Sequence, residues 1–327
     1  MLTRKQSREL KNQIQTQQLY LKHSSINTNL QEHIVIEILE LLDLANKFQV
    51  ETYFQEMLLD PQTKRIEDYN NCYNKEFFDS LINDQIDLSN FLLNHQISEW
   101  VRGIMVDWMI EVFAATNSIN DNSFFRAVNL MDAFLKNTYN YTDQDIHLIG
   151  VSCIFIASKI EDIQSFGIKT ITKKFSHNKF SSYQIKEFEQ FILETLNYDI
   201  NFPTVNDCLQ YLSYQLFGQS QNKYVLMIQE TSNYILKMCY HDYQLTQYNQ
   251  MLLAASILGY TIQHYIQIHM SHLIEKIKIQ LFQTQSNLLR IGQLELIDYL
   301  NCLQKVEELT KDFHIKYPFY RNLQKFN

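Results

Sequence analysis

Apolar side chains recur along most of the chain at the spacing of α-helices. In residues 101–112 (VRGIMVDWMIEV), apolar residues that start at Val101 are separated alternately by three positions and by one, which forms one apolar row. Val106, Ile110 and the following Phe113 form a second row. Side chains at such spacing share one face of a helix, and a helix that is apolar on two sides is mostly buried. The same kind of pattern predicts helices over 73–82, 123–135, 145–162, 168–175, 181–198, 201–217, 222–240, 249–266 and, twice, within 286–314.

Pro203 interrupts this series and marks a boundary between two sets of helices. Thr204, followed three residues later by Asp207, is a variant of the capping box that opens a helix. Beyond it the helical pattern repeats more loosely. We therefore predict an all-α protein of two tandem five-helix folds, at residues 73–201 and 202–327.

The first 72 residues differ in composition from the rest. Residues 1–32 are rich in Gln, Asn and Lys with few large apolar side chains, which predicts a disordered tail. Residues 33–59 carry a heptad seam of barely two repeats, too short for a coiled coil. We expect an extension helix that docks on its own protein, followed by a linker that contains Pro61 and ends at residue 72.

Several charged residues lie within the apolar helices. Arg102 and Asp107 are on one helix, and because they are five residues apart they do not face each other. We expect Asp107 at the edge of the core and assign it no partner. A buried arginine needs a carboxylate with good geometry, and Asp132 on the next helix is the natural candidate. Lys159 ends an apolar helix that carries it out of the core, although a lysine at a helix C-terminus is favourable for the helix dipole alone.

Composition narrows the classes of function. The chain has only 6 glycines and 3 prolines, where average usage gives roughly 23 and 16, so helices joined by short polar loops are favoured over hairpins. The net charge of −8 opposes nucleic acid as a partner. The longest apolar runs are about half the roughly 20 residues that span a bilayer, so no membrane partner is predicted. The five cysteines form no CxxC pair and indicate reduced core residues of an intracellular protein.

Motifs of catalysis and metal binding are weak or missing from the sequence. There is no GxSxG elbow and no glycine-rich phosphate loop. Asp143, Asp145 and His147 could ligate a hard cation, but acidic first turns of helices explain the two aspartates better. His269 and His272 have helical ligand spacing without supporting ligands. We predict no catalytic residue, no metal and no cofactor.

Five segments together resemble the cyclin box, in the order and spacing of cyclins of the A and B types. They are VRGIMVDWMIEV, FFRAVNLMDAFL, HLIGVSCIFIASKIEDI, YQIKEFEQFILETLNYDI and FPTVNDCLQYL. The resemblance runs from about Tyr73 to Leu212 and is weaker beyond. It implies two cyclin folds in a non-catalytic regulatory subunit of the nucleus and cytoplasm, which binds and activates a cyclin-dependent Ser/Thr protein kinase during the cell cycle.

The resemblance also assigns roles to particular residues. Lys159 and Glu189 match the lysine and glutamate that contact the kinase beside its C-helix, and Arg102 and Asp132 match an internal ion pair of the family. Other positions that match the kinase interface are Ile156, Ile160, Glu161, Asp162, Ile163, Leu193, Ile200 and Phe77. Positions that match a groove for substrates or inhibitors with an Arg-x-Leu type motif are Ile104, Met105, Trp108, Glu111, Ile146 and His147.

Two positions of this groove depart from the family pattern. Val101 stands where a methionine is usual, and His147 stands where a glutamine is usual. A histidine introduces the possibility of a pH-sensitive contact. Two other hypotheses stay open at this point. One is a cyclin-box scaffold that binds a partner without activating a kinase, and the other is an enzyme whose site the sequence does not reveal.

Overall fold

The computed structural model describes residues 76–115, 121–218, 223–269 and 284–323. Within these ranges the regular elements are helices, and the only β-type pairing is an isolated bridge between Gln96 and Thr142. The all-α prediction is therefore confirmed for this part of the chain. The predicted tail at 1–32, the extension helix and linker at 33–72, Cys72 and His272 lie outside the described residues.

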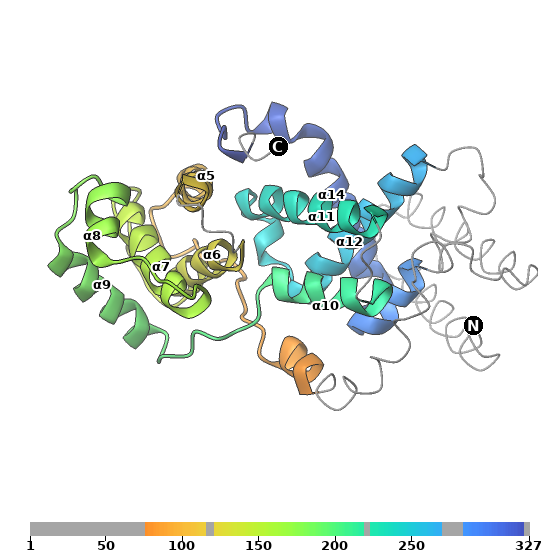
Figure 1. Cartoon of the computed structure of the whole chain (residues 1–327), viewed down its shortest axis with the longest axis horizontal. Coiled ribbons are helices and arrows are strands. Elements are labelled where there is room, and N and C mark those ends of the chain that lie inside the picture. Colours follow the sequence, from red (N-terminus) through yellow and green to blue (C-terminus); the bar gives the residue numbers. More distant parts are fainter. Residues whose placement is uncertain (1–75, 116–120, 219–222, 270–283, 324–327) are drawn as a thin grey trace, which may run out of the picture.

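The first half is a bundle around two central helices (Figure 1). Every residue of α6 from Ser123 to Leu135 is buried, as is every residue of α7 from Ile149 to Ser158. The short helix at 76–83 precedes them. The helices of this half are α5 (Glu99–Ala115), α6 (Asp121–Lys136), α7 (Ile146–Glu161), α8 (Ile168–Thr170), which continues into the π-helical turn η2 (Ile171–Phe175), and α9 (Ser182–Thr195).

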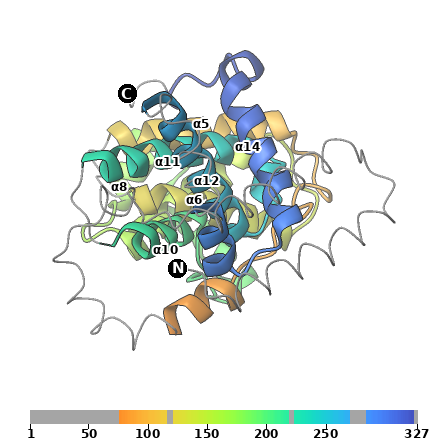
Figure 2. The same cartoon turned by 90° about the vertical axis from the view of Figure 1, so that its right-hand side faces the viewer.

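The second half is arranged around α12, which packs against α10, α11 and α14. Figure 2, seen from this half, shows α14 in front of α12. Its elements are α10 (Val205–Phe217), α11 (Lys223–His241), the 3-10 turn η3 (Leu245–Gln247), α12 (Gln250–His269), a helix at 284–292 and α14 (Leu296–Lys316). The predicted tandem arrangement of two five-helix folds is thus observed.

Side-chain caps fix where several helices begin. The Ser98 hydroxyl accepts a bond from the Val101 backbone N–H at the start of α5, which is the N-cap geometry. Thr204 and Asp207 form the predicted capping box at the start of α10. Ser181 and Gln184 form another at α9. Because these caps satisfy backbone groups that a helix start leaves unpaired, they set the helix boundaries locally.

The cysteines in the described part of the chain are free thiols inside the core, as predicted. Cys153 on α7 and Cys208 on α10 are examples, and Cys239 and Cys302 complete the set. Burial raises the pKa of the Cys153 thiol well above its ordinary value. A buried thiol with a raised pKa is chemically inert, so these residues act as small core side chains.

Candidate partner-binding surfaces

A buried ion pair joins the first two helices of the bundle. The Arg102 guanidinium donates from Nε to Asp132 Oδ1 at 3.0 Å and from Nη2 to Oδ2 at 2.6 Å, and both side chains are at most 1% exposed. The predicted pair is therefore confirmed. A third bond, from Nη1 to the backbone oxygen of Tyr240 at 2.5 Å, ties the pair to α11 of the second half. Nothing in the sequence indicates this last contact, because any residue supplies a backbone carbonyl.

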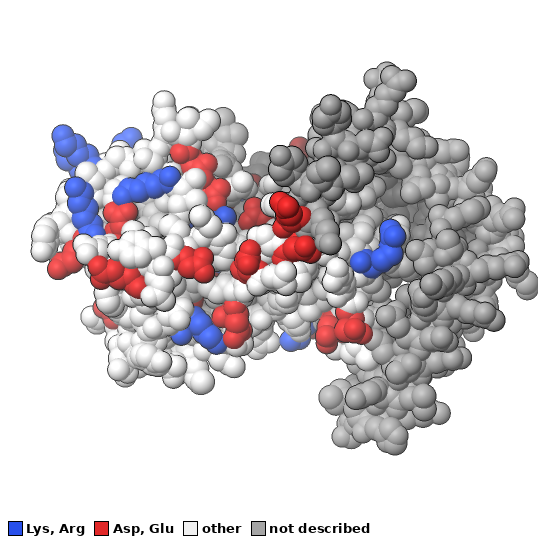
Figure 3. Space-filling model, turned by 90° about the horizontal axis from the view of Figure 1, so that it is seen from below, with Lys and Arg blue, Asp and Glu red and all other residues white. Residues whose placement is uncertain are grey.

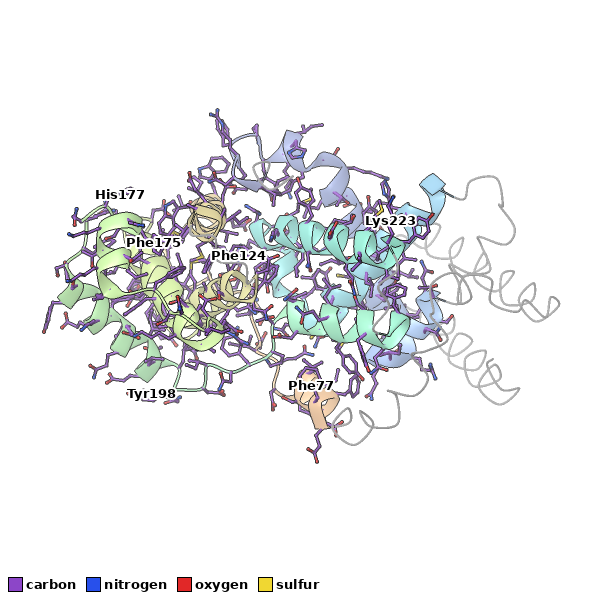
Figure 4. The ribbon with its side chains drawn as sticks, viewed as in Figure 1. Phe77, Phe124, Phe175, His177, Tyr198 and Lys223 are labelled. Carbon is purple, nitrogen blue, oxygen red and sulfur yellow. The ribbon has the colours of Figure 1, made fainter. Side chains whose placement is uncertain are left out.

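The junction between the two halves continues beside this pair with aromatic side chains. The Tyr240 ring lies 6.2 Å from Phe124 and 5.1 Å from Phe125, centroid to centroid. Figure 4 shows Phe124 where the two halves meet. Buried aromatic pairs stabilise a fold by more than the apolar area that they bury. The two folds are therefore packed together through α5, α6 and α11.

A second ion pair lies at the surface of the first half. Lys159, in the last turn of α7, places Nζ 2.5 Å from Glu189 Oε1 on α9, and Nζ is also 3.7 Å from the centroid of the Phe155 ring. The Lys159 side chain is 41% exposed and that of Glu189 is 14% exposed. The structure therefore holds the ammonium group in a fixed position and leaves part of the Lys159 side chain exposed to solvent.

The apolar side chains predicted for the kinase interface differ in how far they are exposed. Ile163 is fully exposed, and Ile160, Leu193 and Ile200 are half-buried against the core. Ile156 is only 2% exposed, because it belongs to the buried stretch of α7. The expectation that Ile156 contributes to a binding surface is corrected accordingly: it supports the surface from beneath.

The acidic residues after Lys159 are engaged within the protein. Arg126 donates from Nε to Glu161 Oε1 at 2.7 Å, and Ser123 donates to Asp162 Oδ1 at 2.6 Å. Arg126 also donates to the backbone oxygen of Phe202 in the segment between the two halves. These bonds fix the end of α7 on α6. Sequence reasoning missed Arg126, although a charge within the apolar run of α6 was a usable signal.

Phe77 lies on the helix at 76–83 and is exposed. Its ring centroid is 6.1 Å from that of Tyr211 on α10. In Figure 4, Phe77 lies beside α10, and Tyr198 lies near the end of α9. The described contacts of Phe77 are therefore with the second half, and its predicted place on the same surface as Lys159 stays a prediction.

The residues predicted for the docking groove lie on α5 and at the start of α7. Ile104 is 43% exposed, and Trp108 is half-buried with its ring edge-on to His147 at 5.2 Å. His147 also lies 5.3 Å from the ring of Phe180. Glu111 is exposed one turn after Trp108. These four predicted residues thus share one surface.

Two residues predicted for the floor of that groove lie beneath it. Met105 is 5% exposed and Ile146 is 4% exposed. The Met105 side chain fills the space beside Gly150 of α7, where an added methyl group would meet its Cε at 2.0 Å. The prediction that Met105 and Ile146 are surface contacts is therefore wrong in this structure, because the close approach of α5 and α7 buries both.

The environment of His147 keeps its imidazole neutral near physiological pH. Partial burial lowers its pKa from 6.5, and the electrostatic influence of Lys179 and His177 lowers it further. A neutral imidazole offers one donor and one acceptor, and a side-chain amide likewise offers both kinds of group. In this respect His147 resembles the glutamine that is usual at this position.

Asp107 is buried, whereas we expected it at the edge of the core without an assigned partner. It is 7% exposed and accepts bonds from Asn322 through both backbone N–H, at 3.2 Å, and side-chain Nδ2, at 2.9 Å. His241 Nε2 lies 3.5 Å from its Oδ1. The expectation was wrong because Asp107 is buried against Asn322, which lies 215 residues away in the sequence, and the pattern of α5 alone does not reveal such a distant partner.

Two of the residues weighed as metal ligands, Asp143 and Asp145, have partners within the protein. Asp143 accepts a bond from the Ser98 backbone N–H at 2.9 Å, and Asp145 accepts from Thr142 at 2.8 Å. In the described ranges no group of three His, Cys, Asp or Glu side chains has the geometry to hold a metal ion. No helix in those ranges is long and apolar enough to cross a membrane.

The charge on one face is uneven. Figure 3 shows acidic side chains in a band across the described part of the face seen from below, with lysines and arginines at scattered positions. A phosphate backbone is bound by a continuous basic stripe. This face does not present one.

Comparison with known proteins agrees with this architecture. The cyclin N-terminal domain family matches residues 73–201. The chain is 30% identical over 171 residues to G2/mitotic-specific cyclin-B of Emericella nidulans, covering 51% of this chain and 33% of that protein. It is 25% identical over 230 residues to cyclin-A2-2 of Arabidopsis thaliana, covering 68% and 48%.

A solved structure of a viral cyclin from herpesvirus saimiri aligns with 64% of this chain and 91% of that chain, at a TM-score of 0.49 and 17% identity. The matches to the first curated relatives span about a third of the length of those proteins. All of these relatives have names of A-type or B-type cyclins or of mitotic cyclins. Residues 73–201 thus match the cyclin N-terminal domain, and the relatives that the chain resembles are named as cyclins.

Proposed function

We propose that this chain is a non-catalytic regulatory subunit that binds and activates a cyclin-dependent Ser/Thr protein kinase in cell-cycle control, in the nucleus and cytoplasm. The observation that carries the proposal is the Lys159–Glu189 pair. The Lys159 ammonium is fixed by a carboxylate at 2.5 Å and by the Phe155 ring, and the Lys159 side chain as a whole is 41% exposed.

The proposed mechanism needs no chemistry from this chain. A kinase is active when its C-helix is held inward so that a glutamate on that helix pairs with the active-site lysine. A partner that binds only the inward position shifts the population toward it. The half-buried side chains of Ile160, Leu193 and Ile200 supply an apolar centre for that contact, and the fixed Lys159 supplies its register.

We further propose that substrates or inhibitors with an Arg-x-Leu type motif bind at α5. Ile104 and Trp108 offer apolar contact for the leucine, and Glu111 offers a carboxylate for the arginine. An arginine and a carboxylate make charge-assisted bonds that are stronger than neutral ones. His147, in edge contact with Trp108, closes the groove on the side of α7.

The kinase proposal is tested with the double variant Lys159→Ala/Glu189→Ala of the tagged chain. Kinase that co-purifies and its phosphorylation of a protein substrate are measured. We expect both to fall about tenfold or more, because central interface residues carry most of the binding energy. The matched control is Lys311→Ala/Glu307→Ala, which removes an exposed pair at 2.6 Å on α14 and leaves both readouts unchanged.

Other outcomes separate the hypotheses. Unchanged kinase recovery and phosphorylation in the Lys159→Ala/Glu189→Ala variant contradict the proposal. A wild-type chain that retains a kinase without raising its activity supports the scaffold hypothesis instead.

A further inference from the structure

The end of the described chain crosses back from the second half to α5. Figures 1 and 2 both show this C-terminal segment beside α5. We name residues 317–323 the C-terminal clasp. It begins at the end of α14, where the Lys316 ammonium and the Tyr317 hydroxyl both donate to Asp242 Oδ2, at 2.8 and 2.9 Å. Tyr320 and Leu323 within it are buried.

A glycine on α5 makes room for the clasp. Gly103 lies in the interior of α5, where glycine is less favourable than alanine by about 1 kcal/mol. A Cβ added there would lie 1.9 Å from Tyr320 Oη and 2.7 Å from its ring carbon Cζ. Tyr320 Oη also donates to the backbone oxygen of Trp100 at 3.4 Å, and the two rings stack at 5.5 Å. The clasp therefore occupies a position that an ordinary α5 side chain would block.

The tip of the clasp bridges two carboxylates of α5. Asn322 Nδ2 lies 2.9 Å from Asp107 Oδ2 and 3.2 Å from Glu111 Oε2, and the Asn322 backbone N–H donates to Asp107 Oδ1 at 3.2 Å. Asp107 and Glu111 are one turn apart and so lie on the same face of the helix. A neutral amide thus holds Glu111, the carboxylate proposed above to receive the arginine of a docking motif.

From this geometry we propose that the C-terminal clasp is an intramolecular competitor that weakens docking of basic-apolar peptides at α5. The inference rests on the proposed docking function. Asn322 turns the Glu111 carboxylate toward the clasp and takes one of its lone pairs. An incoming guanidinium gains its charge-assisted bond in full only when that amide is displaced. The affinity of α5 for such a peptide then depends on how stably the clasp is bound to α5.

Two variants release the clasp by different means. Asn322→Ala removes the bridging amide, and Gly103→Ala places a methyl group where Tyr320 lies without altering either carboxylate. Asn301→Ala, an exposed asparagine on α14, is the control. Each full-length variant is titrated against a fluorescent peptide that contains an Arg-x-Leu motif and against a matched peptide with glutamine in place of arginine, and fluorescence anisotropy is measured.

We expect Asn322→Ala and Gly103→Ala to bind the arginine peptide roughly three- to tenfold more tightly, the range that the net value of one hydrogen bond gives. Their affinity for the glutamine peptide stays at the wild-type value. Equal or weaker binding of the arginine peptide by Gly103→Ala overturns the proposal, even where Asn322→Ala fails to fold. An equal gain for both peptides, or no binding of either peptide to any variant, overturns it as well.

Kinase co-purification from the same preparations reports on the proposed function separately. A gain in peptide affinity without a bound kinase refutes kinase binding and supports the clasp. A bound, active kinase with no gain in peptide affinity refutes the clasp and leaves kinase activation standing.

Discussion

Two ion pairs of the first half each join a basic side chain to a carboxylate, but they differ in exposure to solvent. Arg102–Asp132 and Lys159–Glu189 each join residues 30 apart in sequence on different helices, at 2.6 and 2.5 Å. The first is closed off from solvent, and the Lys159 side chain of the second is 41% exposed. Distance therefore says little about the role of a pair, whereas exposure determines whether its charge is available to a partner.

The buried pair stabilises the fold only as a complete unit. Removing charges from water costs several kcal/mol each, and the pair compensates only with good geometry and satisfied hydrogen bonds. Complete burial raises the pKa of the Asp132 carboxyl, and the guanidinium of Arg102 opposes that rise. Since Arg102 also bonds to the Tyr240 backbone oxygen, it holds α5, α6 and α11 together.

The largest expected effect is that of Arg102→Met. The variant leaves Asp132 buried without its partner, which costs about 3–5 kcal/mol of unfolding free energy. Urea denaturation followed by circular dichroism measures it. Arg102→Met/Asp132→Leu removes both charges, so we expect it to recover a large part of the loss, although the Tyr240 carbonyl still lacks a donor. A loss below about 1 kcal/mol in the single variant would show that burial does not distinguish the two pairs.

Arg126 lies between the two extremes, so its substitution should have an intermediate effect. Its side chain is 9% exposed, and that of its partner Glu161 is 16% exposed. Arg126→Met leaves Glu161 and the Phe202 carbonyl without this donor, which costs about 1–3 kcal/mol. The same denaturation experiment measures it. If the loss were as large as that of Arg102→Met, the bond to Phe202, and not the burial of the ion pair, would determine the loss of unfolding free energy.

The partial burial of His147 makes the stability of the protein depend on pH. The pKa of His147 is lowered from 6.5 in the folded chain, so the unfolded chain binds a proton more readily. Stability that is present above pH 6.5 is therefore lost as the pH falls below that value. The denaturation midpoint at about pH 7.5 and about pH 5.5 should differ less in His147→Gln than in the wild type. An identical pH dependence in both would contradict the assignment.

The sequence predicts best what depends on local pattern. Helix positions follow from apolar spacing, and the Arg102–Asp132 pair follows because a buried arginine on one helix needs a carboxylate on a neighbour. The partner of Asp107 was not predictable, since Asn322 lies in a short segment after α14 that has no helical apolar pattern. Met105 was misassigned because Gly150 lets α5 and α7 approach closely, and a pattern on one helix does not report the shape of its neighbour.

The smallest expected effect on stability is that of the exposed pair. A double-mutant cycle with Lys159→Ala and Glu189→Ala should give a coupling energy of about 0.2–1 kcal/mol, measured by urea denaturation of the four proteins. The same substitutions are expected to lower kinase recovery about tenfold or more. Lys159–Glu189 would then matter for binding and little for stability, whereas Arg102 matters for stability. A coupling energy near 3 kcal/mol would place Lys159–Glu189 with the structural pairs. Loss of kinase binding would then follow from a disordered end of α7, and the Lys159 ammonium would no longer support a docking role.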